Sequence, residues 1–308
     1  MRSPCAEHPP YLSCRRTPLR WRKDPMFRAE AIEGGVVRLV MSRELFGKEL
    51  YPAACYLVVG LLVDTGIAHL RKDLVSFLKG KPFEAIVNTH AHEDHMGANA
   101  LLQKTFKVPI YAHREALPII ARPGRLKLLP YQKLYFGLPA PAHAEPIAEV
   151  LEAGGHRFRV HPAPGHSPDH VLLHEEERGW LFCGDAFIAG QDRVFRGSYD
   201  LAEILGTLRR ILALAPETMF TGMGAVLKRP AAKVRGKIAQ YEEAAERAAD
   251  LFRTGLGEKE ISRKMFPGDG RVRIVTTGDF TALNLVRAFL RYKGIGTVSP
   301  PAVPERVS

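Results

Sequence analysis

The feature that most restricts how this chain can fold is a run of polar residues at positions 89–95, Thr-His-Ala-His-Glu-Asp-His. The run follows a short apolar stretch at residues 83–88, which predicts a buried strand that ends in a loop. Three imidazoles and a carboxylate cannot all be buried in an apolar core without polar partners. Neutral imidazole together with carboxylate is the ligand set of zinc and similar divalent ions. The run therefore predicts a metal-binding loop at the end of a strand.

The spacing within this loop suggests two neighbouring groups of ligands. Side chains alternate along an extended segment, so His90 and His92 are expected to point in the same direction. Asp94 and His95 can then reach a neighbouring position. A solvated polar loop without a metal is the alternative interpretation of the same residues.

Segments typical of strands and of helices alternate from Met26 to about residue 225, which predicts a layered α/β or α+β domain. The expected strands are residues 36–41, 55–63, 83–88, 108–112, 157–161, 170–174 and 180–183. The expected helices are residues 69–78, 96–104, 201–214 and 228–254. Residues 114–145 are expected to be irregular, and a short helix near residue 260 and an apolar helix at 280–292 are expected to follow. Asp279 is the expected N-cap of this last helix.

The first 25 residues differ from the rest of the chain. They contain five of the 23 prolines and two of the four cysteines, and they have no periodic apolar pattern. A secretory signal would need an apolar stretch of about 7–15 residues, which is missing here. We therefore expect residues 1–25 to be a disordered tail or a start-site artefact. Residues 26–227 are the expected catalytic domain and residues 228–308 the expected C-terminal helical module.

Composition narrows the class of protein further. The net charge of +11 is a mild excess for 308 residues and favours anionic partners without identifying them. The longest apolar run, residues 55–63, is far shorter than the roughly 20 residues of a membrane-spanning helix, so no membrane partner is expected. The four cysteines form no Cys-x-x-Cys pair, which fits a reducing, cytoplasmic location.

Four motifs in order resemble the metallo-β-lactamase superfamily. They are an Asp-Thr-Gly turn at Asp64, the His-x-His-x-Asp-His string at 90–95, Pro-Gly-His-Ser at 164–167 and Leu-Phe-Cys-Gly-Asp at 181–185. The resemblance covers about residues 30–225 and points to the branch of glyoxalase-II-like hydrolases and lactamase-like endoribonucleases. It implies an α+β fold, a four-layer αββα sandwich, with a small C-terminal module that is helical and winged-helix-like. Metals would be held by loops at the strand ends.

The resemblance also implies which residues bind metal. The implied ligands are His90, His92, Asp94, His95, His166 and Asp185. The three residues His90, His92 and His166 would hold a first ion, and Asp94 and His95 a second, with Asp185 bridging the two. Zinc is the default cofactor, as one or two ions, and iron and manganese use the same residues in this family.

One ligand of the family pattern is missing. The family has a histidine in a turn where this chain has Gly222-Met223-Gly224, and no histidine follows His174. A thioether matches zinc poorly beside hard carboxylates. We therefore expect the second metal position to be weaker, more open or completed by water.

Further residues are candidates for supporting roles or for substrate contact. Asp64 is expected to support the ligands through hydrogen bonds, and Met223 is a further candidate for a supporting role or for substrate contact. His170 is expected either near the metals or as a hydrogen-bonded core or supporting residue, and Cys183 is expected to be a small core residue. The aromatic residues of the 114–145 segment would form an apolar wall for the substrate, and they are Tyr131, Tyr135 and Phe136.

The ligand set points to hydrolysis. A bound divalent metal lowers the pKa of water and supplies hydroxide, which Asp94 would orient before passing its proton to the leaving group. The expected substrates are ester-type bonds of small molecules (carboxyl ester, lactone, thioester or phosphoester), with a promiscuous range. Two alternatives remain, a nuclease or phosphodiesterase that acts on RNA or DNA, and a non-catalytic scaffold with a degenerate metal site. A homodimer is also left open.

Overall fold

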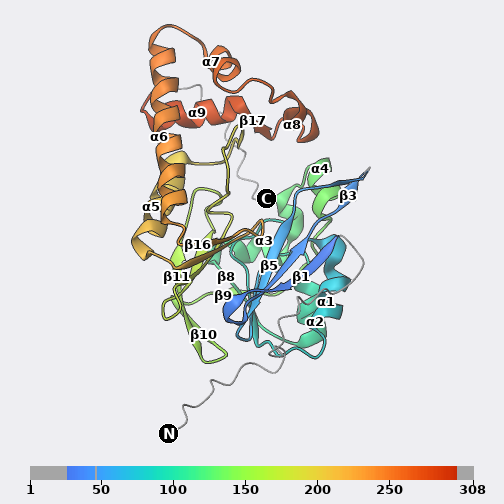
Figure 1. Ribbon diagram of the computed structural model, residues 1–308. Coiled ribbons are helices and arrows are strands. Elements are labelled where there is room, and N and C mark those ends of the chain that lie inside the picture. Colours follow the sequence, from blue (N-terminus) through green and yellow to red (C-terminus); the bar gives the residue numbers. More distant parts are fainter. Residues whose placement is uncertain (1–25, 46, 297–308) are drawn as a thin grey trace. The chain divides into compact units, whose positions relative to one another are not determined.

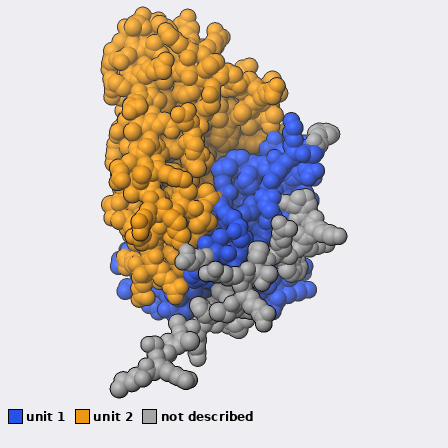
Figure 2. All heavy atoms as spheres, in the orientation of Figure 1, with its two compact units in different colours: residues 1–123, 135–159, 222–224 blue, residues 124–134, 160–221, 225–308 orange. Residues whose placement is uncertain are grey.

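The computed structural model of the chain describes residues 26–45 and 47–296 (Figure 1). The expected tail at residues 1–25 lies outside the described residues. The chain divides into two compact units, coloured separately in Figure 2. Unit 1 consists of the described residues up to Pro123 with 135–159 and 222–224, and unit 2 of 124–134, 160–221 and the described residues from Ala225. The boundary expected at residue 227 stays a prediction.

Unit 1 is built on a seven-stranded sheet with the order β1-β2-β5-β6-β7-β8-β9. Its strands are β1 (Phe27–Ala31), β2 (Val37–Met41), β5 (Ala53–Val58), β6 (Leu61–Val63), β7 (Ala85–Val87), β8 (Ile110–Ala112) and β9 (Glu145–Pro146). The first four strands pair antiparallel, and β6 to β9 pair parallel. A small hairpin, β3 (Glu44–Leu45) and β4 (Lys48–Glu49), lies between β2 and β5. Because parallel strands end at the same edge of a sheet, the loops after β6 and β7 begin side by side.

Helices α1 (Arg71–Leu78) and α2 (Asn99–Phe106) pack on one face of this sheet (Figure 1). Leu74 and Phe77 of α1 and Leu102 of α2 share one apolar core with Leu57 and Ile86 of the sheet. All five side chains are at most 1% exposed, so this core fixes the strand ends from which the loops emerge.

A six-stranded sheet has the order β10-β11-β12-β13-β15-β16. Its strands are β10 (Val150–Ala153), β11 (His156–Pro162), β12 (Val171–Glu175), β13 (Trp180–Gly184), β15 (Thr218–Thr221) and β16 (Val226–Lys228). β10 and the first part of β11 belong to unit 1, and the remaining strands belong to unit 2. β13 and β15 are parallel and are connected through helix α5 (Leu201–Leu214).

The C-terminal helices pack into the core of unit 2. They are α6 (Ala231–Arg253), α7 (Glu258–Met265), α8 (Gly270–Val275) and α9 (Ala282–Tyr292). Val234 of α6 and Leu285 of α9 share an apolar cluster with Leu205 of α5 and with Leu181 of β13. Two short strands, β14 (Phe195–Arg196) and β17 (Phe280–Thr281), pair antiparallel beside them. We call residues 231–296 the C-terminal module.

Several sequence predictions need correction. The stretch 55–63 is two antiparallel strands and not one, because the backbone turns at Val59 (φ 39°) and Gly60 (φ 83°). The segment 114–145 is not irregular throughout, since it contains the 3-10 helices Arg114–Ala116 and Pro123–Leu126, helix α3 (Leu117–Ala121) and helix α4 (Pro130–Phe136).

The end of the chain also differs from the prediction. Helix α8 was not predicted. Helix α9 begins at Ala282, and the side chain of Thr281 accepts the hydrogen bond from the Asn284 amide, so Asp279 is not its N-cap. Among residues 26–45 and 47–296, none of the helices combines the length and the hydrophobicity needed to cross a lipid bilayer.

Candidate metal centre

The polar string of unit 1 lies on the loop between β7 and α2, at the edge where β6 also ends. The backbone amide of Asp64, after β6, donates to Val87 O of β7 at 2.8 Å, and Thr65 N donates to His95 O at 2.8 Å. Gly97 lets the loop approach the chain after β6, because a Cβ at this position would lie 2.3 Å from Ala68 N. The parallel pairing of two strands thus joins segments 25 residues apart in the sequence.

Asp64 holds this loop in place through hydrogen bonds to Thr89 and His95. Its Oδ1 accepts the Thr89 amide at 2.7 Å, and its Oδ2 accepts the Thr89 hydroxyl at 2.8 Å. The same Oδ2 lies 2.8 Å from His95 Nδ1. A carboxylate only accepts hydrogen bonds, so Nδ1 of His95 carries a proton, and in the neutral imidazole Nε2 then keeps its lone pair. This Nε2 lies 3.8 Å from Asp94 Oδ2.

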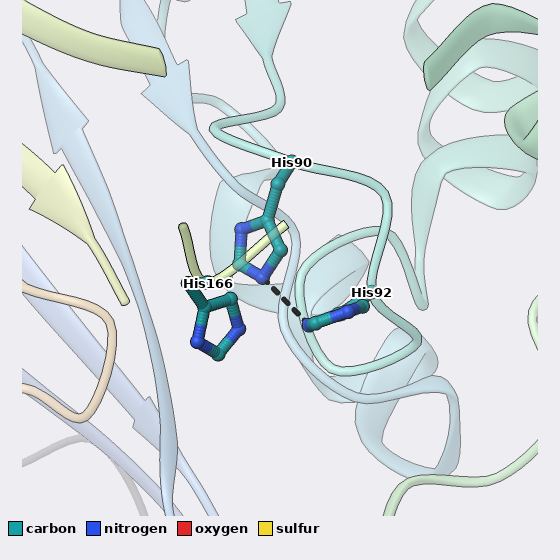
Figure 3. A group of neighbouring side chains, drawn as sticks. All are labelled: His90, His92 and His166. Atoms are coloured by element: carbon teal, nitrogen blue, oxygen red, sulfur yellow. Dashed lines mark hydrogen bonds between the residues drawn. The ribbon is translucent and has the colours of Figure 1, made fainter. Parts of the chain in front are cut away.

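His90 is fixed by the same chain of contacts. The Thr89 hydroxyl lies 3.1 Å from His90 Nδ1. Because the hydroxyl gives its one proton to Asp64, it can only accept from His90, which places the proton on Nδ1 of His90. Nε2 of His90 therefore also has its lone pair, and it lies 3.0 Å from Nδ1 of His92, as the dashed line in Figure 3 shows.

The histidine rings of unit 1 are packed closely. The ring centroids of His90 and His95 are 4.1 Å apart, and those of His90 and His92 are 4.5 Å apart. His90, His95 and Asp94 are buried, and His92 is partly exposed. Unit 1 thus presents buried imidazole nitrogens next to a buried carboxylate, which is the donor chemistry of a divalent transition metal.

A buried polar network that the sequence analysis missed supports this loop. Asn88 donates to His95 O at 3.1 Å, and Asn99 donates to Asn88 Oδ1 at 2.6 Å. The Thr65 hydroxyl donates to Asn99 Oδ1 at 2.8 Å. All three side chains are at most 1% exposed. The sequence did offer a signal for this network. Thr65 and Asn88 are uncharged polar residues near the ends of two apolar strands, where a buried polar side chain needs a hydrogen-bond partner.

Unit 2 contributes the remaining predicted ligands. His166 follows β11, and Asp185 follows β13; Nε2 of His166 lies 3.7 Å from Oδ2 of Asp185. Figure 3 also draws the His166 imidazole. Nε2 of His170 accepts the backbone amide of Asp185 at 3.1 Å, and His170 O accepts from Ala163 N at 2.8 Å. His170 therefore fixes the backbone shortly before His166, at Ala163, and the backbone of Asp185 itself.

Helix α5 holds the loop that carries His166. The Thr207 hydroxyl donates to Pro164 O at 2.9 Å, and Arg210 donates to Pro162 O. Gly165 has a φ of +122°, and a Cβ there would lie 2.5 Å from the backbone nitrogen of Ile204. The loop therefore approaches the helix so closely that only glycine fits at residue 165.

The three aromatic candidates all lie on helix α4, and the boundary between the two units runs through this helix. Tyr131 belongs to unit 2, where its hydroxyl donates to Asp279 Oδ2 at 2.6 Å. Tyr135 and Phe136 belong to unit 1, where the Phe136 ring packs edge-on against Tyr51 at 6.3 Å. Tyr131 and Phe136 are both buried.

Met223 and Cys183 complete the list of predicted residues. Met223 is partly exposed in the turn between β15 and β16; of its neighbours, Gly222 accepts from the Ala54 amide and Gly224 from Arg38 Nη1. Cys183 is fully buried in the apolar core, as predicted. Burial and the nearby Asp185 charge raise the pKa of its thiol, so it is not a nucleophile at neutral pH.

Comparisons with known proteins support the fold. The model of the metallo-β-lactamase superfamily matches residues 50–223, which is more than half of the chain. A metallo-β-lactamase family protein of Thermus thermophilus has a similar structure, with a TM-score of 0.60, 20% identity and coverage of 83% of this chain and 94% of that one. A metallo-β-lactamase of Pontibacter korlensis has a TM-score of 0.55, with 17% identity and coverage of 70% and 98%. The predicted fold class is confirmed.

Two curated relatives match over part of their length. A β-lactamase-like protein 2 homologue of Drosophila melanogaster is 29% identical over 207 residues, which are 62% of this chain and 64% of the relative. A hydroxyacylglutathione hydrolase of Bdellovibrio bacteriovorus is 28% identical over 160 residues, which are 51% and 55% of the two chains. The match thus spans between about half and two thirds of these relatives.

Proposed function

This chain belongs to the metallo-β-lactamase superfamily, and from that premise we propose that it is a metal-dependent hydrolase of small-molecule ester-type bonds, with thioesters as the first class to test. One observation carries the proposal. On the loop after β7, Asp64 and Thr89 fix the tautomers of His95 and His90 so that both Nε2 atoms keep a lone pair. A loop that merely meets solvent has no need of such an arrangement.

The proposed ligands come from both units. His90, His92 and His166 would hold one ion, and Asp94 and His95 a second, with Asp185 shared between them. The donor set of imidazole and carboxylate suits zinc, and iron or manganese are the alternatives. Because Met223 stands in the turn where the family has a histidine, the second position would bind its ion more weakly than the first.

The chemistry follows from these groups. A divalent ion bound there would lower the pKa of a water molecule towards neutrality and polarise the bond to be cleaved. Asp94, which is 7% exposed, would orient the attacking oxygen, accept its proton and pass it to the leaving group. Asp64 would keep His95 in one tautomer throughout, and His170 would keep the backbone of Asp185 in place.

The substrate class is inferred from relatives. The Bdellovibrio relative and a Synechococcus relative, 30% identical over 158 residues, are both named hydroxyacylglutathione hydrolases, and hydroxyacylglutathiones are thioesters. Each match covers 55% of the relative. This likeness supports testing thioesters before lactones, carboxyl esters and phosphoesters.

The experiment measures metal content and hydrolysis in one preparation. Purified protein is analysed by mass spectrometry for metal per chain, then assayed with a hydroxyacylglutathione, a lactone, a phosphodiester and a short single-stranded RNA. We expect between one and two ions per chain and turnover of the thioester that is lost with chelator and restored by zinc. The variant Asp94→Asn should keep metal at the first position and lose turnover. Absence of metal and of turnover after reconstitution would refute the proposal, and cleavage of RNA alone would move it to the nuclease alternative.

A further inference from the structure

The segment between β13 and α5, residues 186–200, connects Asp185 with an aromatic ring that touches His166. The ring of Tyr199 packs against the His166 imidazole, with centroids 4.9 Å apart and planes inclined by 43°. Tyr199 is 8% exposed, so this contact is buried. The proposed ligand His166 therefore has an aromatic neighbour that restricts how its ring can turn.

The C-terminal module holds this segment by backbone pairing. β14 pairs with β17 of the module, with Phe195 opposite Thr281 and Arg196 opposite Phe280. Asn284 of α9 donates from Nδ2 to Phe195 O at 3.2 Å. Both strands belong to unit 2, which is drawn in one colour in Figure 2.

The pairing of β14 with β17 brings an aromatic residue of the module, Phe280, into contact with Tyr199. The Phe280 ring meets the Tyr199 ring edge-on, with centroids 6.0 Å apart and an angle of 85°. Phe195 meets Tyr199 from another direction at 5.4 Å. Three rings in contact, Phe280, Tyr199 and His166, thus connect the module to a proposed metal ligand.

A polar cluster fixes Phe280 in turn. The Arg196 guanidinium lies 5.0 Å from the Phe280 ring centroid, and its Nε donates to Asp279 Oδ2 at 3.0 Å. The Tyr131 hydroxyl donates to the same oxygen at 2.6 Å. Burial raises the pKa of Tyr131, so the hydroxyl stays protonated and remains a donor at neutral pH.

The module also anchors the start of the segment. Lys237 of α6, which is 5% exposed, lies 2.8 Å from Asp192, and the Tyr241 hydroxyl donates to the same carboxylate. Arg193 donates to Pro267 O, after α7, at 2.8 Å. The module therefore contacts the segment along most of its length between Asp185 and Tyr199.

We propose that the C-terminal module positions the metal centre, and that Phe280 and Tyr199 are positioning residues which fix the orientation of the His166 ring. This inference rests on the proposed function insofar as His166 is a metal ligand. An imidazole turns about two bonds, and a ring held before the ion arrives loses less freedom on binding it. Residues that orient metal ligands contribute roughly 10- to 100-fold to metal affinity.

The test substitutes Phe280→Leu and measures zinc affinity by competition with a chromogenic chelator. We expect an affinity at least about 10-fold weaker than that of the wild type, at the low end of the effect of a ligand-orienting residue. Tyr199→Leu should behave alike, and Tyr199→Phe, which keeps the ring, should retain wild-type affinity. The matched control is Phe289→Leu in α9. Phe289 is 1% exposed and packs on Phe266, so its loss should lower stability and leave the zinc affinity unchanged.

Two results would overturn the inference, namely wild-type affinity in Phe280→Leu, or an equal loss of affinity in Phe289→Leu. A wild-type protein that binds no zinc would refute the proposed function instead. The inference is then judged in the metal-free protein from the proton NMR signals of the His166 ring, assigned with His166→Gln. Phe280→Leu should shift these signals and Phe289→Leu should not, and unshifted signals in Phe280→Leu would reject the positioning role.

Discussion

The two units orient their candidate ligands by different means. In unit 1, hydrogen bonds with Asp64, Thr89 and Asn88 fix His90 and His95, and all but Asp64 lie within eight residues of one another. In unit 2, the ring of His166 is oriented by Tyr199, which in turn depends on Phe280, and Phe280 lies more than 100 residues after His166 in the chain. Hydrogen bonds fix the direction and the tautomer of an imidazole, whereas packing against an aromatic ring fixes only the space into which the imidazole fits.

This difference predicts unequal sensitivity. The unit 1 ligands should tolerate changes in distant parts of the chain and respond strongly to single polar substitutions nearby. His166 should respond to remote apolar substitutions that leave its own neighbours in the sequence intact.

The largest effect should come from removing a ligand in either unit. His90→Asn and His166→Asn should each lower kcat/KM for the thioester by more than the roughly 100-fold that loss of a supporting residue can cost. His143→Asn, at an exposed position of unit 1, is the control and should keep full activity. A strong loss for one of the two ligands alone would show that only one unit serves the metal.

The next effect concerns Asp64, whose hydrogen bonds set the unit 1 tautomers. Asp64→Asn should weaken zinc binding by roughly 10- to 100-fold. Asp64 accepts through both of its oxygens, whereas an amide replaces one of them with an NH2 donor and loses the bonds made there. Competition with a chelator measures the zinc affinity. The control is Asp250→Asn, at an exposed helix position, which should leave this affinity unchanged. Unchanged affinity would mean that packing and not hydrogen bonding orients the ligands of unit 1 as well.

A smaller effect is expected from the helix that holds the His166 loop. Thr207→Val removes the bond to Pro164 O and should lower the free energy of unfolding by about 1 kcal/mol in urea titration. Thr105→Val, in α2, removes an exposed hydroxyl that bonds its own helix at Leu101 O, and should change stability by less than about 0.5 kcal/mol. Equal losses in the two variants would mean that the contact of α5 with the loop adds nothing specific.

The smallest effect is on the free energy of unfolding at alkaline pH. It arises from one buried thiol in each unit. Burial raises the pKa of Cys55 in unit 1 and of Cys183 in unit 2. Below the unfolded thiol pKa of about 8.5 both states are protonated and stability is unaffected. Above it the unfolded state loses the proton first, so stability falls with rising pH, by about 1.4 kcal/mol per pH unit for each thiol. Urea titrations between pH 8 and 10 should give a shallower decline for both Cys55→Ala and Cys183→Ala. If a variant leaves the slope of the unfolding free energy against pH unchanged, the thiol that it removes is in contact with water in the folded state.

The candidate metal loop is the part of the molecule whose prediction needed only local sequence. The string at residues 90–95 and the turn at Asp64 point to their chemistry through residue type and spacing alone. The network of Thr65, Asn88 and Asn99 was missed because each of these residues is unremarkable in sequence and gains its role only when two parallel strands end together.

Two predictions of local structure failed, and each failure has a physical reason. Asp279 has the sequence features of an N-cap, yet Thr281 takes that position and Asp279 pairs with Arg196 instead. The turn at Val59 and Gly60 has few of the residues typical of turns, so an apolar run of two strands was predicted to be one. Asp279 is held by partners distant in sequence, whereas the turn at Val59 and Gly60 is local and was missed because Val59 adopts a positive φ, which is rare for valine.

Residues 222–224 have a consequence for synthesis of the chain. They belong to unit 1, where Gly222 O accepts from Ala54 in β5 and Gly224 O accepts from Arg38 in β2. A growing polypeptide therefore cannot complete the hydrogen bonds of its first compact unit until residues 222–224 have left the ribosome. At roughly 5–20 residues per second, β2 and β5 are without these partners for about ten seconds or more after their own synthesis. During that interval the amide of Ala54 and the guanidinium of Arg38 lack these acceptors, and this is the stage at which a chaperone would have the most to protect.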